Sequence, residues 1–293
     1  MRLNFSRTGL LAFTSLLAAI TPMFSQTNQS QIEKRERLAR KPIQKKVSPK
    51  LVHEALDEED SIRELFSLGD EAVPSLVQFL SDSDNESRLG AARGLAYIGN
   101  QQGMQALRNA IKAETDEETK SAMTCFLAGG LVEAKSESDL HFLKSSVERA
   151  DFAADDEKDF PAFCAALALG MMGRSDSLPI LRKAAGADLL NSEEIGKAIQ
   201  WIESRSTARQ ATKRPSTSDQ ELIKKTVLEG TFFGRDELNE TSVDQLTFNR
   251  KRNRALVSVE IYHGPKSARW YDLALAKESG MWRVVGIWFA AVA

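Results

Sequence analysis

The sequence predicts a mainly α-helical protein, in which a solenoid of stacked α-α helix pairs is followed by a small α+β part with an antiparallel sheet. Two observations carry this prediction. Apolar runs that end in glycine recur along the middle of the 293-residue chain, and the periodicity of the apolar residues changes from helical to alternating near residue 255. A composition of 42% hydrophobic and 27% charged residues is typical of globular proteins and excludes a chain that is disordered throughout.

The repeat is marked by four glycines, each of which closes an apolar helical run and is followed by a second apolar helix. They are Gly69, Gly99, Gly130 and Gly173, at spacings of 30, 31 and 43 residues. A period near 30 residues is the length of one helix pair, which cannot bury its apolar stripe alone and therefore stacks on its neighbours. The longer third interval predicts an insertion over residues 146–159, on one edge of the solenoid.

Local signals support the helix boundaries. Capping boxes, in which a hydroxyl caps the first turn and a glutamate three residues later reaches back, occur at Ser61 and Thr115. Pro74 and Pro179 stand early in the second helix of their pairs, where a missing backbone N–H costs nothing. These signals predict a repeat domain over residues 51–204.

One stretch carries a family resemblance. In Ala91-Ala-Arg-Gly-Leu-Ala-Tyr-Ile-Gly99, small residues and an arginine precede an apolar run that closes in glycine. This pattern resembles the HEAT-like repeats of the phycobilisome-lyase type, and the resemblance extends over residues 60–204. It implies stacked helix pairs but hardly constrains function.

The two ends of the repeat domain differ from it in composition. Residues 1–25 read as a secretory signal peptide, with Arg2 and Arg7 before an apolar stretch, and residues 26–50 are a basic flexible segment. We therefore expect an exported protein, periplasmic or secreted after cleavage, with an uncleaved N-terminal membrane anchor as the alternative. The basic segment is a solvated spacer that makes at most weak contact with an anionic surface.

Residues 205–217 predict a linker, and residues 218–293 a small α+β domain. A short helix through Leu228 precedes strands over 255–263, 269–277 and 281–289, with a fourth strand near 246–249. The closing hairpin from Trp270 to Trp288 resembles the last two strands of nuclear-transport-factor-like domains. That resemblance implies a sheet that curls around a helix and holds a small ligand, and a cystatin-like helix on a sheet is the competing shape.

The two cysteines, Cys125 and Cys164, are expected to be free. Counting back from the terminal glycine of each helix places them one turn apart along the axis. With helix axes about 10 Å apart, their Cα atoms come out near 12 Å, beyond the limit of about 7 Å for a disulfide. A single bridge is the minority alternative.

The search for chemistry gives no convincing catalytic site. Each histidine, His53, His141 and His263, is assigned to the surface or to a helix cap, and no metal or cofactor is expected. Asp272 is the one candidate general base, with a polar position on an exposed sheet face as the simpler interpretation. The candidate lining of a ligand pocket in the last domain is aromatic: Tyr262, Trp270, Trp282 and Trp288.

The net negative charge of the repeat region restricts the class of partner it can bind. Residues 51–205 carry 29 acidic and 15 basic side chains, so a cationic or polar partner fits the repeats and nucleic acid does not. The basic run 250–254 is read as a charged turn. The leading hypothesis is an exported protein-binding or scaffold protein that recognises a protein or peptide on its solenoid surface, with no enzymatic activity expected. The alternatives are a small-ligand-binding protein or enzyme with a pocket in the last domain, and a lyase.

Overall fold

The computed structural model describes residues 47–133, 136–150, 160–187, 192–205, 218–228, 241–262 and 268–292. All of them belong to one compact unit, residues 47–293. The predicted signal peptide, most of the basic segment and the predicted linker from residue 206 onwards lie outside the described residues. So do His263 and most of the predicted insertion, residues 151–159.

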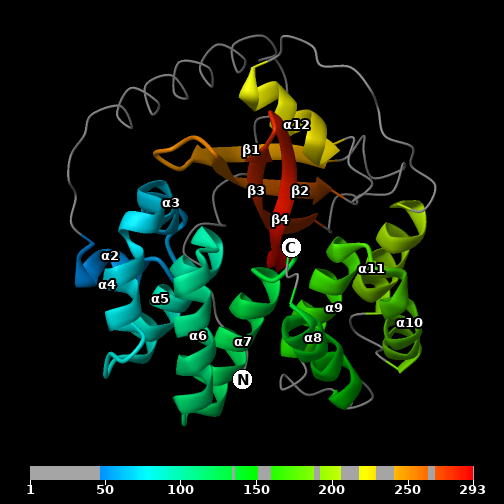
Figure 1. Cartoon of the computed structure of the whole chain (residues 1–293), viewed down its shortest axis with the longest axis horizontal. Helices are drawn as coiled ribbons and strands as arrows, with labels where there is room; N and C mark the ends of the chain where they lie inside the picture. Colours follow the sequence, from blue (N-terminus) through cyan, green and yellow to red (C-terminus); the bar gives the residue numbers. More distant parts are fainter. Residues whose placement is uncertain are drawn as a thin grey trace, which may run out of the picture. The chain divides into compact units, whose positions relative to one another are not determined.

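The helical part is a series of helix pairs, as predicted, preceded by α2 (Pro49–Glu54) and followed by α11 (Ser192–Arg205) (Figure 1). The first helix of each pair ends at a repeat glycine: α3 (Glu59–Leu68), α5 (Asn85–Ile98), α7 (Glu117–Gly129) and α9 (Phe160–Met172). The second helices are α4 (Val73–Phe79), α6 (Gln101–Ala113), α8 (Glu137–Arg149) and α10 (Leu178–Ala187). Short 3-10 turns, η1 (Gly69–Glu71) and η3 (Ser175–Ser177), precede α4 and α10.

Successive pairs stack side by side, because α3 packs against α5, α5 against α7 and α7 against α9. Polar contacts follow the same period. The hydrogen bonds Asn100 to Asp70, His53 to Asp84, Arg108 to Asp139 and Lys144 to Asp176 join residues 30, 31, 31 and 32 positions apart. One side chain of each repeat thus bonds to the equivalent region of the next repeat, as translational stacking requires.

Three of the four repeat glycines end their helices for a conformational reason. Gly69, Gly99 and Gly173 have φ angles of +60°, +62° and +68°, a region that favours glycine because it has no Cβ. The structure contradicts two predicted helix caps, Ser61 and Thr115. Ser61 is buried inside α3, and the cap of α7 is Asp116, whose carboxylate accepts a hydrogen bond from the backbone N–H of Thr119.

The sheet is a four-stranded antiparallel meander in the order β1-β2-β3-β4, which confirms the predicted strands and the fourth strand ahead of them. Its strands are β1 (Thr241–Phe248), β2 (Arg254–Tyr262), β3 (Ala268–Glu278) and β4 (Met281–Val292). Bulges interrupt the register of β1 with β2 and of β3 with β4. The predicted turn at residues 264–267 lies outside the described residues.

The sheet packs between the repeats and α12 (Asp219–Leu228) (Figure 1). One face contacts the first helices, through β1 on α3 and β4 on α7 and α9. On the other face, α12 buries Ile223 and Val227 and its Asp219 bonds to Lys277 of β3. The residues that the sequence sets apart as a small α+β domain therefore share one hydrophobic core with the repeats.

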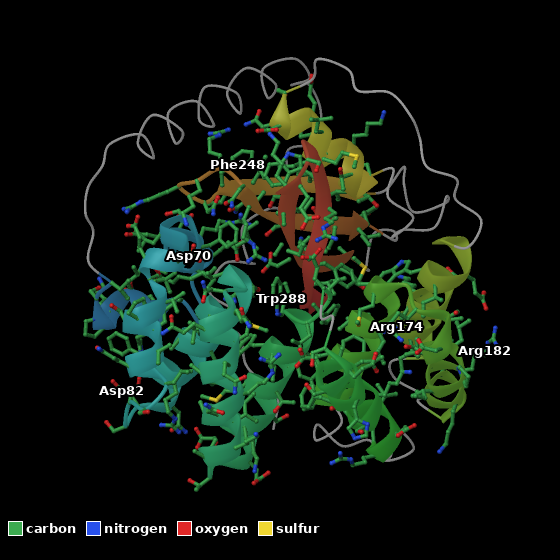
Figure 2. The ribbon with its side chains drawn as sticks, viewed as in Figure 1. Asp70, Asp82, Arg174, Arg182, Phe248 and Trp288 are labelled. Carbon is green, nitrogen blue, oxygen red and sulfur yellow. A yellow bond between two sulfur atoms is a disulfide. The ribbon has the colours of Figure 1, made fainter. Side chains whose placement is uncertain are left out.

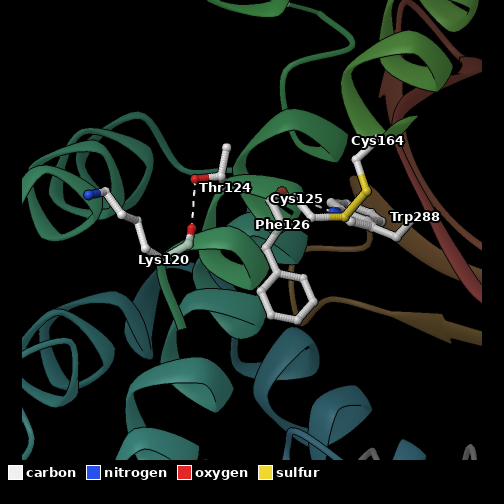
Figure 3. Close-up of a disulfide and its surroundings, with 6 residues drawn as sticks. All are labelled: Lys120, Thr124, Cys125, Phe126, Cys164 and Trp288. Atoms are coloured by element: carbon white, nitrogen blue, oxygen red, sulfur yellow. Dashed lines mark hydrogen bonds between the residues drawn. A yellow bond between two sulfur atoms is a disulfide. The ribbon is translucent and has the colours of Figure 1, made fainter. Parts of the chain in front are cut away.

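Cys125 of α7 and Cys164 of α9 form a disulfide with Cα atoms 5.3 Å apart, so the prediction of two free thiols is wrong (Figure 3). The prediction equated the Cα–Cα distance with the distance between helix axes. A Cα atom lies about 2.3 Å from its axis, so facing Cα atoms on axes about 10 Å apart approach to about 5–6 Å. The short distance also shows that α7 and α9 are not aligned by their terminal glycines.

Among the residues described, no helix combines the length and the apolar character needed to cross a membrane.

Candidate functional site

Asp272 lies in the middle of β3, on the face of the sheet that meets the first helices. Its neighbours across the strands are Ser258 on β2 and Trp288 on β4. Asp272 is 1% exposed, so it does not occupy the exposed sheet face that the simpler interpretation of the sequence gave it. It belongs to the interface between the sheet and the repeats.

Both carboxylate oxygens of Asp272 accept hydrogen bonds. The hydroxyl of Tyr97, on α5, donates to Oδ2 over 2.7 Å, and the hydroxyl of Ser258 donates to Oδ1 over 2.6 Å. The guanidinium of Arg93, one turn before Tyr97, lies 3.4 Å from Oδ2. The carboxylate is thus held by one helix and one neighbouring strand.

A second arginine makes a parallel connection from α3. Arg63 is 6% exposed and donates to the Thr247 hydroxyl and to the Leu256 carbonyl, each over 3.2 Å, and to the Ser258 hydroxyl. Glu59, one turn earlier on α3, forms an ion pair with Arg63, with Oε1 2.6 Å from Nη2. Its other oxygen, Oε2, lies 3.6 Å from Nη2 of Arg93. We call these residues the interface network: Glu59, Arg63, Arg93, Tyr97, Ser258 and Asp272.

Electrostatics keeps the donors of the interface network protonated. Burial raises the pKa of Tyr97 well above its usual value, and the nearby Asp272 carboxylate raises it further, although Arg93 opposes the shift. Burial alone would lower the pKa of Arg93, but Tyr97, Asp272 and Glu59 together raise it. Two guanidinium groups and two carboxylates therefore lie in balance between the helices and the sheet, an arrangement suited to attachment rather than to proton transfer.

Sequence reasoning missed both arginines, although a signal exists. Arg63 and Arg93 each stand six residues before a repeat glycine, Gly69 and Gly99. Equivalent positions in stacked repeats point the same way, so the recurrence places two cations on one face of the solenoid. Asp272, the acidic partner of Arg93, lies 179 residues further on, and only the fold brings it there.

The four aromatic residues predicted to line a pocket do not meet. The Trp288 ring stacks on Tyr97 with centroids 4.1 Å apart, and its indole N–H donates to the Phe126 carbonyl over 3.0 Å, next to the disulfide (Figures 2 and 3). Trp282 is on the opposite side of the sheet, where its indole N–H donates to Asp219 of α12. Tyr262 is 46% exposed at the end of β2, and Trp270 is half-buried on β3.

The basic run 250–254 forms the turn between β1 and β2, as predicted, and lies against the ends of two first helices. The backbone N–H of Arg250 donates to the Ser67 carbonyl, and the Arg254 guanidinium donates to the Ile98 carbonyl. Arg250 pairs with Glu71, and Lys251 with Asp70. Cations at helix C-termini complement the negative end of the helix dipole, so this turn is bound to the chain's own repeats.

A cavity of about 230 Å³ opens beside this turn. We call it the turn cavity, and its lining comes from the ends of α3 and α5, from the start of α6 and from the turn itself: Phe66, Gly69, Asp70, Ile98, Asn100, Asn249, Asn253 and Arg254. None of the sequence-predicted pocket residues lines it.

The described histidines are engaged locally. His53 lies 3.1 Å from Asp84 and 3.0 Å from Glu86, at the start of α5. His141 lies 3.4 Å from the Ser145 hydroxyl, one turn further along α8. Within the described ranges, no group of three or more metal-ligating side chains is gathered in one place.

The other edge of the solenoid is acidic. The turns that lead from one pair into the next carry side chains that are exposed or half-buried: Asp82, Asp84, Glu86, Asp116, Glu117 and Glu118. We call this surface the acidic edge. Asp82 lies at the end of the repeats away from the sheet, whereas Asp70 lies at the end toward the sheet, where it pairs with Lys251 of the β1–β2 turn (Figure 2). The sheet therefore leaves the acidic edge uncovered.

Comparison with known proteins agrees with the geometry in the first half of the described chain. The family model of HEAT repeats matches residues 54–128, which span α3 to α7 almost completely. No curated protein gives a significant match. HEAT repeats generally mediate protein–protein interactions, so the match agrees with an interaction or scaffold role without naming a partner. Residues 54–128 are thus similar to HEAT repeats, and the helix pairs that follow continue the same stacking beneath the chain's own four-stranded sheet.

Proposed function

We propose that this chain is an exported protein-binding scaffold, which recognises its partner on the part of the repeat surface that its own sheet leaves free. The observation that carries the proposal is the placement of the sheet on HEAT-like repeats. The interface network and Trp288 occupy the faces of α3, α5 and α7. Within the described ranges, no strand makes an extensive contact with the second helices, so these helices and the acidic edge remain for a partner.

The chemistry of the free surface favours a cationic or polar partner. The exposed side chains of α6 include Gln101, Gln102, Gln105 and Asn109, and the acidic edge adds exposed carboxylates at the starts of α5 and α7. Attraction between such an edge and a basic protein surface is long-range and screened by salt. The acidic surplus of residues 51–205 points in the same direction.

The test is cross-linking of the full chain in its native extract, followed by binding measurements with each captured protein. Glu117→Gln and Glu118→Gln together neutralise exposed side chains of the acidic edge without touching its capping residues Asp84 and Asp116. We expect weaker binding in the double variant and at raised salt. Glu221→Gln, an exposed acid on α12, is the matched control. Binding that is equal in all three proteins would remove the acidic edge from the proposal.

Export rests on a separate argument. The reading of residues 1–25 as a signal peptide is supported by the disulfide between Cys125 and Cys164, since disulfides persist in oxidising compartments. Trapping of thiols in intact cells, combined with fractionation, tests this. We expect an oxidised protein of reduced length outside the cytoplasm. Membrane-bound protein of full length would favour the anchor, and reduced cysteines in the cytoplasm would refute export.

The rival function is catalysis or ligand binding at Asp272. Both oxygens of that carboxylate accept protein hydrogen bonds, and the turn cavity does not include it. Turnover of a small molecule by the wild-type chain that disappears in Asp272→Asn, while the variant remains folded, would revive this alternative.

A further inference from the structure

The turn cavity contains a cation whose charge the protein does not balance. Arg254 lines the cavity, and its guanidinium donates to the Ile98 carbonyl. Its Nε–H is buried without an acceptor. Among the described residues, no carboxylate lies within ion-pair distance of this guanidinium, whereas Arg250 and Lys251 in the same turn each have an acidic partner.

The fold leaves space for the Arg254 guanidinium at the end of α5. A Cβ atom at Gly99 would lie 2.8 Å from Nη2 of Arg254, so glycine at this repeat end leaves room for the guanidinium against the backbone. Burial lowers the pKa of Arg254, and the nearest acids, Glu133 and Asp70, offset this only at longer range. A largely buried cation without a paired carboxylate is costly, and an anion that enters the cavity would relieve that cost.

The rest of the lining indicates what kind of anion fits. Asn100, Asn249 and Asn253 bring amide groups to the wall, and Asp70 is already occupied by Asn100 and Lys251. Phe66 and Ile98 form an apolar side. An organic acid satisfies both sides, because its carboxylate takes guanidinium and amide donors while its carbon skeleton lies on Phe66 and Ile98.

We propose that the turn cavity binds a small organic carboxylate, with Arg254 as its counter-ion. The ligand would contact both the ends of two repeats and the β1–β2 turn, so its binding stabilises the attachment of the sheet to the solenoid. This site is separate from the acidic edge, and it holds or fails independently of the protein partner proposed above.

The test is calorimetric titration and thermal unfolding of the full chain with acetate, succinate and citrate, against sodium chloride of equal ionic strength. Inorganic phosphate and sulfate form a second arm. We expect saturable binding of at least one carboxylate and a matching rise in Tm. Loss of a charge-assisted contact in Arg254→Gln should weaken binding by about 10- to 100-fold. Arg252→Gln, an exposed cation in the same turn that lies over Phe248, should bind as the wild type does.

A second variant decides the matter if Arg254→Gln does not fold. Asn253 accepts a hydrogen bond from Asn249, and Asn253→Asp keeps that acceptor while it adds a carboxylate to the cavity wall. We expect the folded variant to lose carboxylate binding, because the new charge repels the ligand and balances Arg254. No saturable binding to the wild type, equal binding to Asn253→Asp, or binding of phosphate and sulfate alone would overturn the proposal.

Discussion

At the scale of single residues, Asp272 balances cations that the interface network buries between helix and sheet. Asp272→Asn keeps the shape of the side chain but removes the nearer of the two carboxylates that face Arg93, whose side chain is 12% exposed. Removing one partner of a buried ion pair costs about 3–5 kcal/mol, so we expect a loss of that order in the free energy of unfolding measured with urea. Asp244→Asn, an exposed acid on β1, is the control. Equal losses in the two variants would show that the network contributes nothing specific.

His53 predicts a dependence on pH. Its hydrogen bond to Asp84 raises the pKa of the imidazole, and the pKa of Asp84 is lowered to about 2, chiefly by hydrogen bonds from Ser87. A group whose pKa is raised on folding stabilises the fold below its unfolded pKa, about 6.5 for histidine. This contribution disappears as the pH rises through the folded pKa.

Unfolding free energies of the wild type and His53→Gln should therefore differ most at acidic pH and converge as the solution becomes alkaline. The difference is small because the His53 side chain is 48% exposed to screening solvent. A difference that grows with pH would contradict the assigned protonation.

At the scale of elements, the close approach of α7 to β4 depends on Gly129. A Cβ atom there would lie 2.4 Å from the Ile287 carbonyl oxygen and from the Trp288 ring. Gly129→Ala should destabilise the protein, because backbone rather than a flexible side chain must move. Gly196→Ala, inside α11, meets nothing within 4 Å and should stabilise by up to about 1 kcal/mol. Thermal unfolding of both variants measures the contrast, and a stable Gly129→Ala protein would argue against the contact.

The disulfide joins α7 to α9 across 39 residues of sequence. In the chain-entropy model, a closed loop of about 40 residues stabilises the folded state by about 4 kcal/mol. Urea unfolding with and without reductant should show a loss of this order, and the double variant Cys125→Ala, Cys164→Ala should no longer respond to reductant. A reductant effect that persists in the double variant would point to another cause.

At the scale of the whole molecule, residues 47–293 form one compact unit, and the sheet shares its core with the repeats. We expect a single cooperative transition, with coincident curves from far-UV circular dichroism and tryptophan fluorescence. Helices dominate the first signal, while Trp282 and Trp288 report on the sheet and Trp201 on α11. Two separated transitions would show that the sheet unfolds independently.

The sequence predicts those parts of this molecule that depend on local periodicity. Glycines such as Gly99 and alternating runs such as residues 255–261 place the helix pairs and the strands, because their signals lie within about 30 residues. The docking of the sheet was not predictable in this way. It depends on Arg63, Arg93 and Asp272, which the fold gathers from distant segments, and periodicity carries no information about such encounters.

The disulfide escaped prediction for a related reason. Whether Cys125 and Cys164 meet is decided by the rotation and level of α7 relative to α9, and spacing along the chain fixes neither. The sequence offers Asp272 as a candidate general base or as a polar residue on an exposed sheet face. Its burial could not be predicted, because it follows from a helix surface encoded 175 residues earlier.

A solenoid ordinarily tolerates gain or loss of a module, since each module touches only its neighbours. Here the four-stranded sheet contacts several repeats at once, because its strands are bound to α3, α5, α7 and α9. The width of the sheet must match the number of repeats beneath it. Duplicating a single helix pair would therefore separate the contact residues on the helices from their partners on the strands. Repeats can therefore be added only beyond the part of the solenoid that the sheet contacts, or together with a matching change in the sheet.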